Sequence, residues 1–310
     1  MKLFVLTELM KSDQPVKSKS SYVPHKAAAE FEPTMDWSFD EAAEEYNSRI
    51  FTFEVDQIYY EDCINGMKNL PPESIDMIIA DPPFGLRFNE KEVLYNRDSQ
   101  YVAEGYKDVE IENYEEFTRR WIAELPRILK GNAGVWIFSG WTHLADILNS
   151  LKENNLFLIN HIIWKYQFGV FTRRKFVTSH YHILFATKSE KEYFFNKIEH
   201  YPLDVWEINR DYDRGKKKNA TKLPVDVVKR CIDFGSKPGD IVLDPFMGNG
   251  TSAVVAKGSF RHFLGYEVNP ELESIISKNL SKITVGQNYI PYSDNPDELV
   301  KKARQKFGKK

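Results

Sequence analysis

The chain has 310 residues and a formal net charge of −3, with 42 Lys and Arg against 45 Asp and Glu. This length allows a complete hydrophobic core without disulfide or metal support, and the acidic balance argues against a protein that coats nucleic acid through bulk charge. The two cysteines, Cys63 and Cys231, form neither a CxxC pair nor a cluster with zinc-ligand spacing, and the apolar run at 3–6 is too short for a signal-peptide core or a membrane span. We therefore expect a soluble cytoplasmic protein with no metal and no membrane contact.

Along the chain, residues 11–35 are rich in Lys, Ser, Pro and Ala without a period, which predicts an extension over 1–54 that is disordered in part. Folding signals begin near residue 36, where apolar runs start to alternate with helical patterns. Several runs are too apolar to have a solvated face, as is typical of a mostly parallel sheet covered by helices on both sides. We expect seven strands, near 57–60, 75–80, 134–138, 158–164, 181–186, 240–243 and 262–266, and amphipathic helices at 117–129 and 224–234.

The first motif that carries chemistry is Asp81-Pro82-Pro83-Phe84, directly after the strand expected at 75–80. Prolines lack an N–H donor and fix the backbone, so the motif holds a carboxylate and a free carbonyl rigidly at a sheet edge. Asp81 and the Pro82 carbonyl can each accept one hydrogen of an NH2 group, while Phe84 stacks on the ring that bears it. The following residues, 86–112, lack periodicity and are expected to form a mobile active-site loop, with an ordinary solvated connection as the alternative.

The second motif is Asp244-Pro-Phe246-Met-Gly248-Asn-Gly250-Thr251, between an expected strand and a helical run. A turn with glycines that leads from a strand into a helix lets the backbone approach a ligand closely. Glu267 ends the next expected strand, close to the ~20-residue offset at which a carboxylate meets ribose hydroxyls in nucleotide-binding units. The pattern predicts a nucleotide-like cofactor.

Together the two motifs resemble those of the β-class DNA amino-methyltransferases of restriction–modification systems, in which a D-P-P-[YFW] motif precedes a motif similar to D-P-F-x-G-x-G-T. The resemblance covers about residues 55–285 and implies a Rossmann-like α/β fold dependent on S-adenosylmethionine, with a circularly permuted motif order. It also implies the contacts of the cofactor: Asp62 with the adenine, Glu267 with the ribose, Phe246 and Gly248 with the methionine moiety, Thr221 or Lys222 with its carboxylate, and Asp81, Asp244, Gly250 and Thr251 completing the site.

Two residue choices depart from the family. Thr221-Lys222-Leu-Pro stands where Glu-Lys-Pro or Gln-Lys-Pro is usual, which leaves open whether Thr221 or Lys222 binds the carboxylate, and Phe84 replaces the commoner Tyr. The implied organisation is a catalytic half at 55–187, a short target-recognition insertion at 188–219, a cofactor-binding half at 220–286 and a basic tail at 287–310.

Duplex DNA is the expected partner, with a cognate restriction endonuclease as a further one and a monomer or homodimer as the assembly. The target amine is inaccessible within a duplex, so the base must be flipped. Residues 165–230 hold fifteen Lys and Arg against eight Asp and Glu, and such a segment can bind phosphates without reading sequence. The expected DNA-binding residues are Arg173, Arg174, Lys175, Arg210, Arg214, Lys216, Lys217 and Lys218.

In the family that the motifs resemble, an acidic first residue in the catalytic motif is usual for adenine enzymes and Ser for cytosine-N4 enzymes. The resemblance therefore implies adenine N6 as the methylated amine, with cytosine N4 as the alternative. An RNA or protein-glutamine methyltransferase is disfavoured because the catalytic motif precedes the cofactor glycines. A nicotinamide-dependent oxidoreductase is disfavoured because the run Phe246-Met-Gly248-Asn-Gly250 lacks the third glycine of the dinucleotide fingerprint. A catalytically silent DNA-binding protein would not need both motifs.

Overall fold

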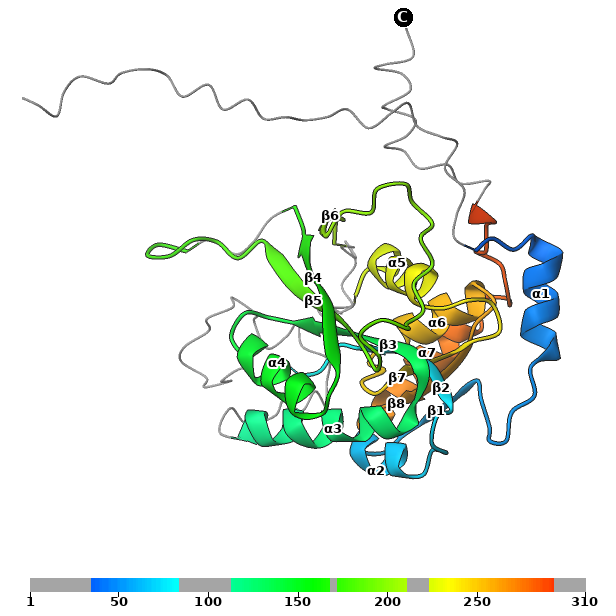
Figure 1. Cartoon of the computed structure of the whole chain (residues 1–310), viewed down its shortest axis with the longest axis horizontal. Helices are drawn as coiled ribbons and strands as arrows, with labels where there is room; N and C mark the ends of the chain where they lie inside the picture. The colour runs from blue at the N-terminus through cyan, green and yellow to red at the C-terminus, as the bar shows by residue number, and fades with distance from the viewer. Residues whose placement is uncertain (1–34, 84–112, 168–171, 211–222, 293–310) are drawn as a thin grey trace, which may run out of the picture. The chain divides into compact units, whose positions relative to one another are not determined.

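The computed structural model describes residues 35–83, 113–167, 172–210 and 223–292. In these ranges a single sheet of eight strands runs in the order β1-β8-β7-β2-β3-β5-β4-β6 (Figure 1). The strands are β1 (Gln57–Tyr59), β2 (Ile75–Ala80), β3 (Leu129–Ser139), β4 (Phe157–Lys165), β5 (His180–Thr187), β6 (Val205–Glu207), β7 (Ile241–Asp244) and β8 (His262–Tyr266).

Five adjacent strands, β1, β8, β7, β2 and β3, are parallel to one another. Strand β5 is antiparallel to both β3 and β4, and β6 is parallel to β4. The α/β class and the mostly parallel sheet expected from the sequence are confirmed. The number of strands was wrong, because the described part of the sheet has eight. The additional strand, β6, has only three residues and lies inside the segment expected to be an insertion, where its exposed–buried–exposed pattern is too short to stand out.

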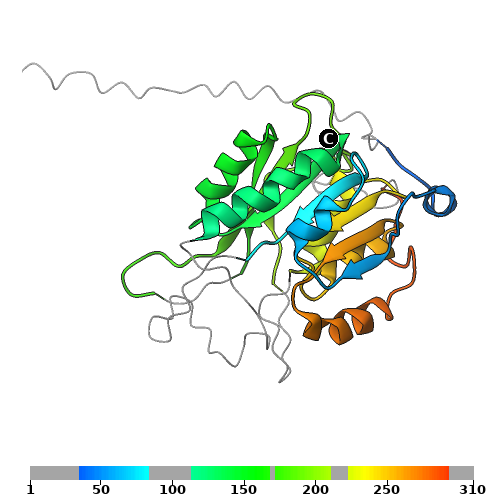
Figure 2. The ribbon, with the colours of Figure 1, turned by 90° about the horizontal axis from the view of Figure 1, so that it is seen from below.

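Helices cover both faces of this sheet (Figure 2). One face packs on buried side chains of α2, α3 and α4, and the other on those of α5, α6 and α7. Figure 1 shows α2 and α3 below the sheet and α5 and α6 above it. The helices are α1 (Phe39–Ser48), α2 (Cys63–Lys68), α3 (Tyr114–Ile128), α4 (Leu144–Glu153), α5 (Val225–Gly235), α6 (Thr251–Gly258) and α7 (Glu273–Leu280), with a 3-10 turn η3 (Pro270–Leu272) before α7. None of these helices in the described ranges is long and apolar enough to span a membrane.

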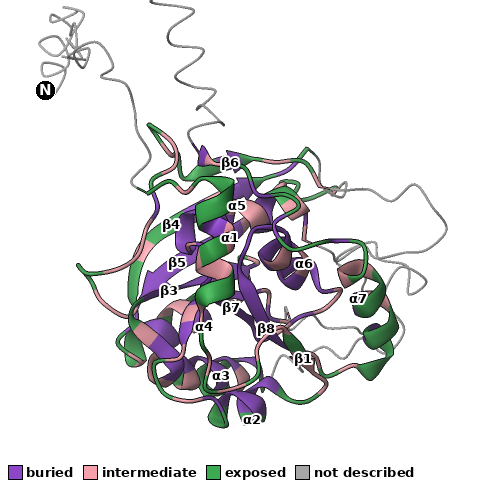
Figure 3. Ribbon diagram, turned by 90° about the vertical axis from the view of Figure 1, so that its right-hand side faces the viewer, coloured by how far each residue is buried: buried purple, intermediate pink, exposed green. Residues whose placement is uncertain are grey.

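Helix α1 lies within the segment expected as an N-terminal extension. Its first residue follows Ser38, whose side chain and that of Glu41 cap the helix start reciprocally. The helix leaves much of its surface exposed (Figure 3) but packs its aromatic side chains on residues at and just before the start of β8. The Phe39 ring lies 5.0 Å from that of Phe260, and the Tyr46 ring stacks at 4.0 Å on His262.

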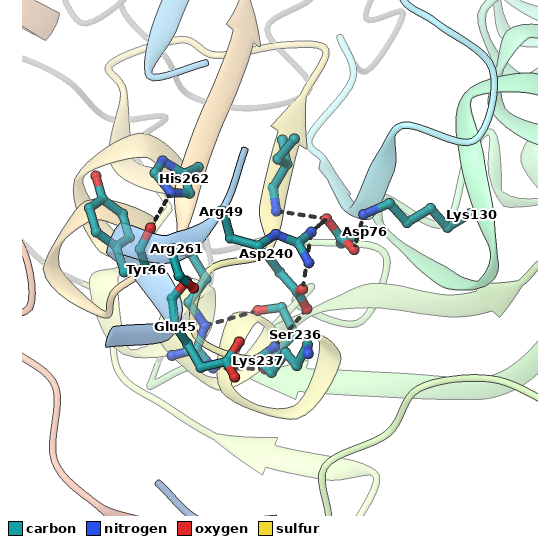
Figure 4. A network of polar contacts seen from close by, with 12 residues as sticks. Glu45, Tyr46, Arg49, Asp76, Lys130, Ser236, Lys237, Asp240, Arg261 and His262 are labelled. Atoms are coloured by element: carbon teal, nitrogen blue, oxygen red, sulfur yellow. Dashed lines mark hydrogen bonds and ion pairs between the residues drawn. The ribbon is translucent and has the colours of Figure 1, made fainter. Parts of the chain in front are cut away.

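A polar network ties the end of α1 to the amino ends of β2 and β7 (Figure 4). The Asp76 carboxylate accepts hydrogen bonds from Arg49 at 3.1 Å, from Lys130 at 2.6 Å and from the Ile241 amide at 3.0 Å. Beside it, Asp240 accepts from the Lys237 amide at 2.9 Å. Burial and the charge of Asp76 raise the pKa of Asp240 to about 7. This network lies at the sheet edge opposite to the carboxyl ends of the parallel strands.

Candidate active site

The two sequence motifs meet at the carboxyl edge of the parallel strands. Asp81 directly follows β2, Asp244 ends β7 and Glu267 directly follows β8. The register pairs Ile78 with Leu243 and Asp244 with Gly265, so these three acids leave adjacent strands at the same edge. Neighbouring strands are ~4.8 Å apart. Residues separated by more than half of the chain thereby become neighbours.

The turn at 245–250, between β7 and α6, is the expected cofactor turn, and Asp244 holds it in shape. This buried carboxylate accepts a hydrogen bond from the Phe246 amide at 2.9 Å and another from the Ser252 hydroxyl on α6. Burial raises the pKa of Asp244 to about 6, with the charge of Glu267 adding to the shift. Sequence reasoning expected Asp244 among the cofactor contacts, whereas both of its oxygens bond within the turn. It missed Ser252, whose only sequence signal is its position in the first turn of the helix.

Glu267 connects the end of β8 to the same turn. One carboxylate oxygen accepts from the Gly248 amide at 2.8 Å and the other from the Asn269 amide at 2.8 Å. Burial raises the pKa of Glu267 while these amide bonds oppose the shift. Because a carboxylate offers about four acceptor sites, both oxygens retain the capacity to accept from the hydroxyls of a ligand.

The two glycines of the turn adopt backbone conformations that side chains rarely take. Gly248 has φ +53° and Gly250 has φ +78°. A Cβ added at Gly250 would lie 3.0 Å from Ile276, whereas one added at Gly248 would meet, among the described residues, only the Phe246 carbonyl oxygen, at 3.8 Å. The space beside Gly248 is therefore open to a ligand that comes close to the backbone.

An aromatic wall borders the turn. The Phe246 ring lies 5.3 Å from that of Trp121 and 5.9 Å from that of Phe117, both on α3. Since α3 packs on the sheet through Trp121, these contacts fix the position of Phe246. The open space at Gly248, the acceptors of Glu267 and this fixed ring fit a ligand that carries a ribose and a flexible aliphatic chain with charged groups, as S-adenosylmethionine does.

Asp62 lies at the outer end of the same sheet edge. It caps the start of α2 by accepting from the Asn65 amide at 3.0 Å. The Tyr59 carbonyl at the end of β1 accepts from the Glu267 amide at 3.0 Å, which joins this region to the cofactor turn. Asp62 is exposed, so its second oxygen is accessible from the edge where the cofactor is expected.

The catalytic motif is described as far as Pro83. Asp81 and Pro83 are partly buried and Pro82 is buried. Ala80, just before them, pairs with Ile137 on β3, so the carboxylate leaves a strand that is held on both sides. Several predicted site residues and segments lie outside the described residues: Phe84, the loop 86–112, Thr221, Lys222, Arg214, Lys216, Lys217, Lys218 and the tail beyond 292.

The remaining DNA-binding candidates have two different settings. Arg173, Arg174 and Lys175 are exposed between β4 and β5. The Arg210 guanidinium instead lies over aromatic rings, 4.1 Å from the centre of Tyr166 and 4.8 Å from that of Tyr181. Cation–π contacts of this kind hold Arg210 against the protein.

The comparisons with known proteins agree with this arrangement. The family model described as DNA methylase, which covers N6 and N4 enzymes, matches residues 75–278, a range that includes both motifs. The chain belongs to this family. It is 30% identical over 249 residues to the type II methyltransferase M.HinfI of Haemophilus influenzae, covering 74% of this chain and 69% of the relative. The family resemblance found in the sequence is thus confirmed.

Two solved structures share the fold of this DNA methylase. The M1.HpyAVI–SAM complex matches with a TM-score of 0.54 at 26% identity, over 72% of this chain and 99% of that one. The cytosine-N4-specific PvuII DNA methyltransferase matches with a TM-score of 0.55 at 15% identity, over 78% of this chain and 100% of that one. The expected methyltransferase fold is confirmed. The fold leaves the choice of base open, since an enzyme described as cytosine-specific shares it.

Proposed function

We propose that this DNA methylase transfers a methyl group from S-adenosylmethionine to adenine N6 of a base flipped out of duplex DNA, at a specific site and in a cytoplasmic restriction–modification role. The observation that carries the proposal is the placement of the Asp81 motif and the Gly248 turn at the ends of the adjacent strands β2 and β7. This placement brings the amine that Asp81 binds next to the cofactor that the Gly248 turn binds, as transfer of the methyl group from the cofactor to the amine requires.

The residues of the second motif have separate tasks in this proposal. Glu267 accepts from the ribose hydroxyls and Asp62 from the adenine amine of the cofactor, while Phe246 and Gly248 border its methionine part. Thr221 or Lys222 binds the carboxylate. Asp244, Gly250 and Thr251 shape the turn, as the bonds of Asp244 to Phe246 and Ser252 illustrate. When bound, S-adenosylmethionine supplies a methyl group that its sulfonium has already activated.

The first motif prepares the nucleophile. The lone pair of an exocyclic amine is delocalised into the ring, and Asp81 with the Pro82 carbonyl favours the pyramidal nitrogen by accepting its two hydrogens. Rigid placement of this nitrogen beside the methyl donor provides most of the acceleration, as a proximity effect. The ammonium that forms on transfer is strongly acidic and releases its proton to Asp81 or to water.

The Asp81→Ala variant tests the role of the motif. We expect it to lose methyl transfer to DNA while it binds S-adenosylmethionine as the wild type does, because Asp81 faces the amine and Glu267 the cofactor. Tritium transfer to DNA and calorimetric titration with the cofactor measure the two properties. A variant with near-normal turnover would refute the assignment.

The target base is tested separately. Asp81 at the first position favours adenine, and cytosine N4 is the second candidate because both amines flank a ring nitrogen that can accept a hydrogen bond. DNA from cells that express the wild type is digested to nucleosides and analysed by mass. N6-methyladenine supports the proposal, whereas N4-methylcytosine as the sole product refutes the base assignment and leaves the role of Asp81 intact. Sequencing that reads methylated bases gives the recognition site.

A further inference from the structure

The turn between β4 and β5 presents an aromatic side chain to solvent beside three cations. Phe176 is 98% exposed and follows the exposed residues Arg173, Arg174 and Lys175. Resting on the proposed function, we infer that Phe176 enters the base stack of the DNA and fills the gap that the flipped base leaves. The three cations next to it would contact the phosphates on either side.

The sheet places this turn at the edge where the chemistry occurs. Strand β3 is parallel to β2, and β5 is antiparallel to β3, with Ser139 at the end of β3 opposite His182 near the start of β5. The connection from β4 into β5 therefore emerges at the same edge as Asp81. Strand β5 is two positions from β2 in the sheet, about 10 Å at the usual strand spacing. Figure 1 shows the described part of this turn projecting beyond the start of β5.

The root of the turn is braced, although its end is exposed. The Tyr166 amide donates to the Ser179 carbonyl at 3.0 Å and extends the β4–β5 pairing by one step. The Arg210 guanidinium lies over the rings of Tyr166 and Tyr181. The Arg210 backbone amide donates to the Gln167 side-chain oxygen at 2.9 Å, and the Gln167 side-chain amide donates to the Arg210 carbonyl at 3.2 Å. A rigid root holds a projecting side chain in place without a large loss of entropy on binding.

The chemistry of this turn fits DNA better than another partner. A single exposed aromatic residue is too small for a protein interface, but apolar wedges of this size enter base steps, and stacking on an aromatic ring is insensitive to sequence. Thr172 donates to the Lys175 carbonyl and closes the turn just before Phe176. The two functions of the turn, phosphate contact and stacking, thus lie on consecutive residues.

The test compares methyl transfer by Phe176→Ala and wild type to two duplexes that carry the recognition site found with the wild type. In one duplex the target base is paired, and in the other it is mismatched, which lowers the energy required to flip it. We expect the single-turnover rate of the variant to fall at least tenfold on the paired duplex and clearly less on the mismatched one. Phe176→Trp should retain the rate, and cofactor affinity and melting temperature should not change.

Two further variants serve as controls. Phe157→Ala makes the same change at the start of β4, at the opposite sheet edge, and should leave both rates unchanged. Trp141→Ala removes another large aromatic side chain at the sheet edge where Asp81 lies, 62% exposed just after the end of β3. If Phe176→Ala keeps the wild-type rate on the paired duplex, or if Trp141→Ala and not Phe176→Ala shows the selective fall on the paired duplex, the inference is wrong. If the wild type transfers no methyl to DNA, the proposed function itself fails.

Discussion

Gly248 and Gly250 share a left-handed backbone conformation but differ in their surroundings, which makes their alanine variants a matched pair. A residue other than glycine in this conformation loses roughly 1–2 kcal/mol, equivalent to about 2–8 °C in melting temperature for a domain of this size. At Gly250 the added Cβ also lies 3.0 Å from Ile276, and such overpacking destabilises by a further ~1 kcal/mol. Gly250→Ala should therefore be the less stable variant.

Cofactor affinity should rank the two variants in the opposite order. The Cβ at Gly248 enters the open space that we assign to the methionine part of S-adenosylmethionine, where its nearest neighbour among the described residues is 3.8 Å away. We expect Gly248→Ala to weaken binding at least about tenfold, ~1.4 kcal/mol, and Gly250→Ala to stay within roughly threefold of wild type. Calorimetric titration measures affinity and thermal denaturation measures stability. If Gly248→Ala loses stability but binds the cofactor like wild type, the ligand does not occupy the space beside Gly248.

Three further predictions address other residues. Glu267→Ala should weaken S-adenosylmethionine binding by roughly 10–100-fold, because charge-assisted bonds contribute ~1.5–3 kcal/mol each, and unchanged calorimetric affinity would contradict the ribose assignment. The folded state binds the Asp240 proton more tightly than the unfolded state, so the free energy of unfolding should fall as the pH rises from about 4 to about 7. Asp240→Asn should reduce this fall in urea denaturation at pH 5 and pH 8, and an identical pH dependence would contradict it. Changing Lys216, Lys217 and Lys218 to Gln should lower the slope of log K against log salt by up to ~0.9 per phosphate contact, whereas a solvated run would leave the slope unchanged.

Most of the sheet could be predicted because buried parallel strands are continuous apolar runs. Strand β2 has five buried residues out of six, and all four residues of β7 are buried. Strand β6 offers only one buried side chain, Trp206, between two exposed residues. The sequence also could not predict that β4 and β5 pair antiparallel, because neither strand carries a local signal of its pairing direction. This pairing places their connection at the sheet edge where Asp81 lies.

The candidate site was predictable in its residue types and less so in its contacts. Acids and glycines at the ends of expected strands indicate a site at the carboxyl edge of the sheet, and the structure places Asp81, Asp244 and Glu267 at this edge. Which acid faces a ligand depends on neighbours that spacing does not reveal. The Asp244 carboxylate accepts from Ser252 within the turn. Arg210 resembles the other cations in sequence, but its guanidinium lies over the rings of Tyr166 and Tyr181.

The strand order has a consequence for biosynthesis. Strands β7 and β8, from the last part of the chain, lie between β1 and β2, from its first part. The Ile241 amide that bonds to Asp76 is made 165 residues later, roughly 10–30 s at typical rates of translation. During that interval the nascent chain holds β2, one of its most apolar strands, with an open edge, and β1 has no neighbour in the sheet. A chain truncated before β8 would therefore have an incomplete sheet and a strong tendency to aggregate. The turn that we assign to the cofactor is complete only once Glu267 has been synthesised and β8 has paired with β7.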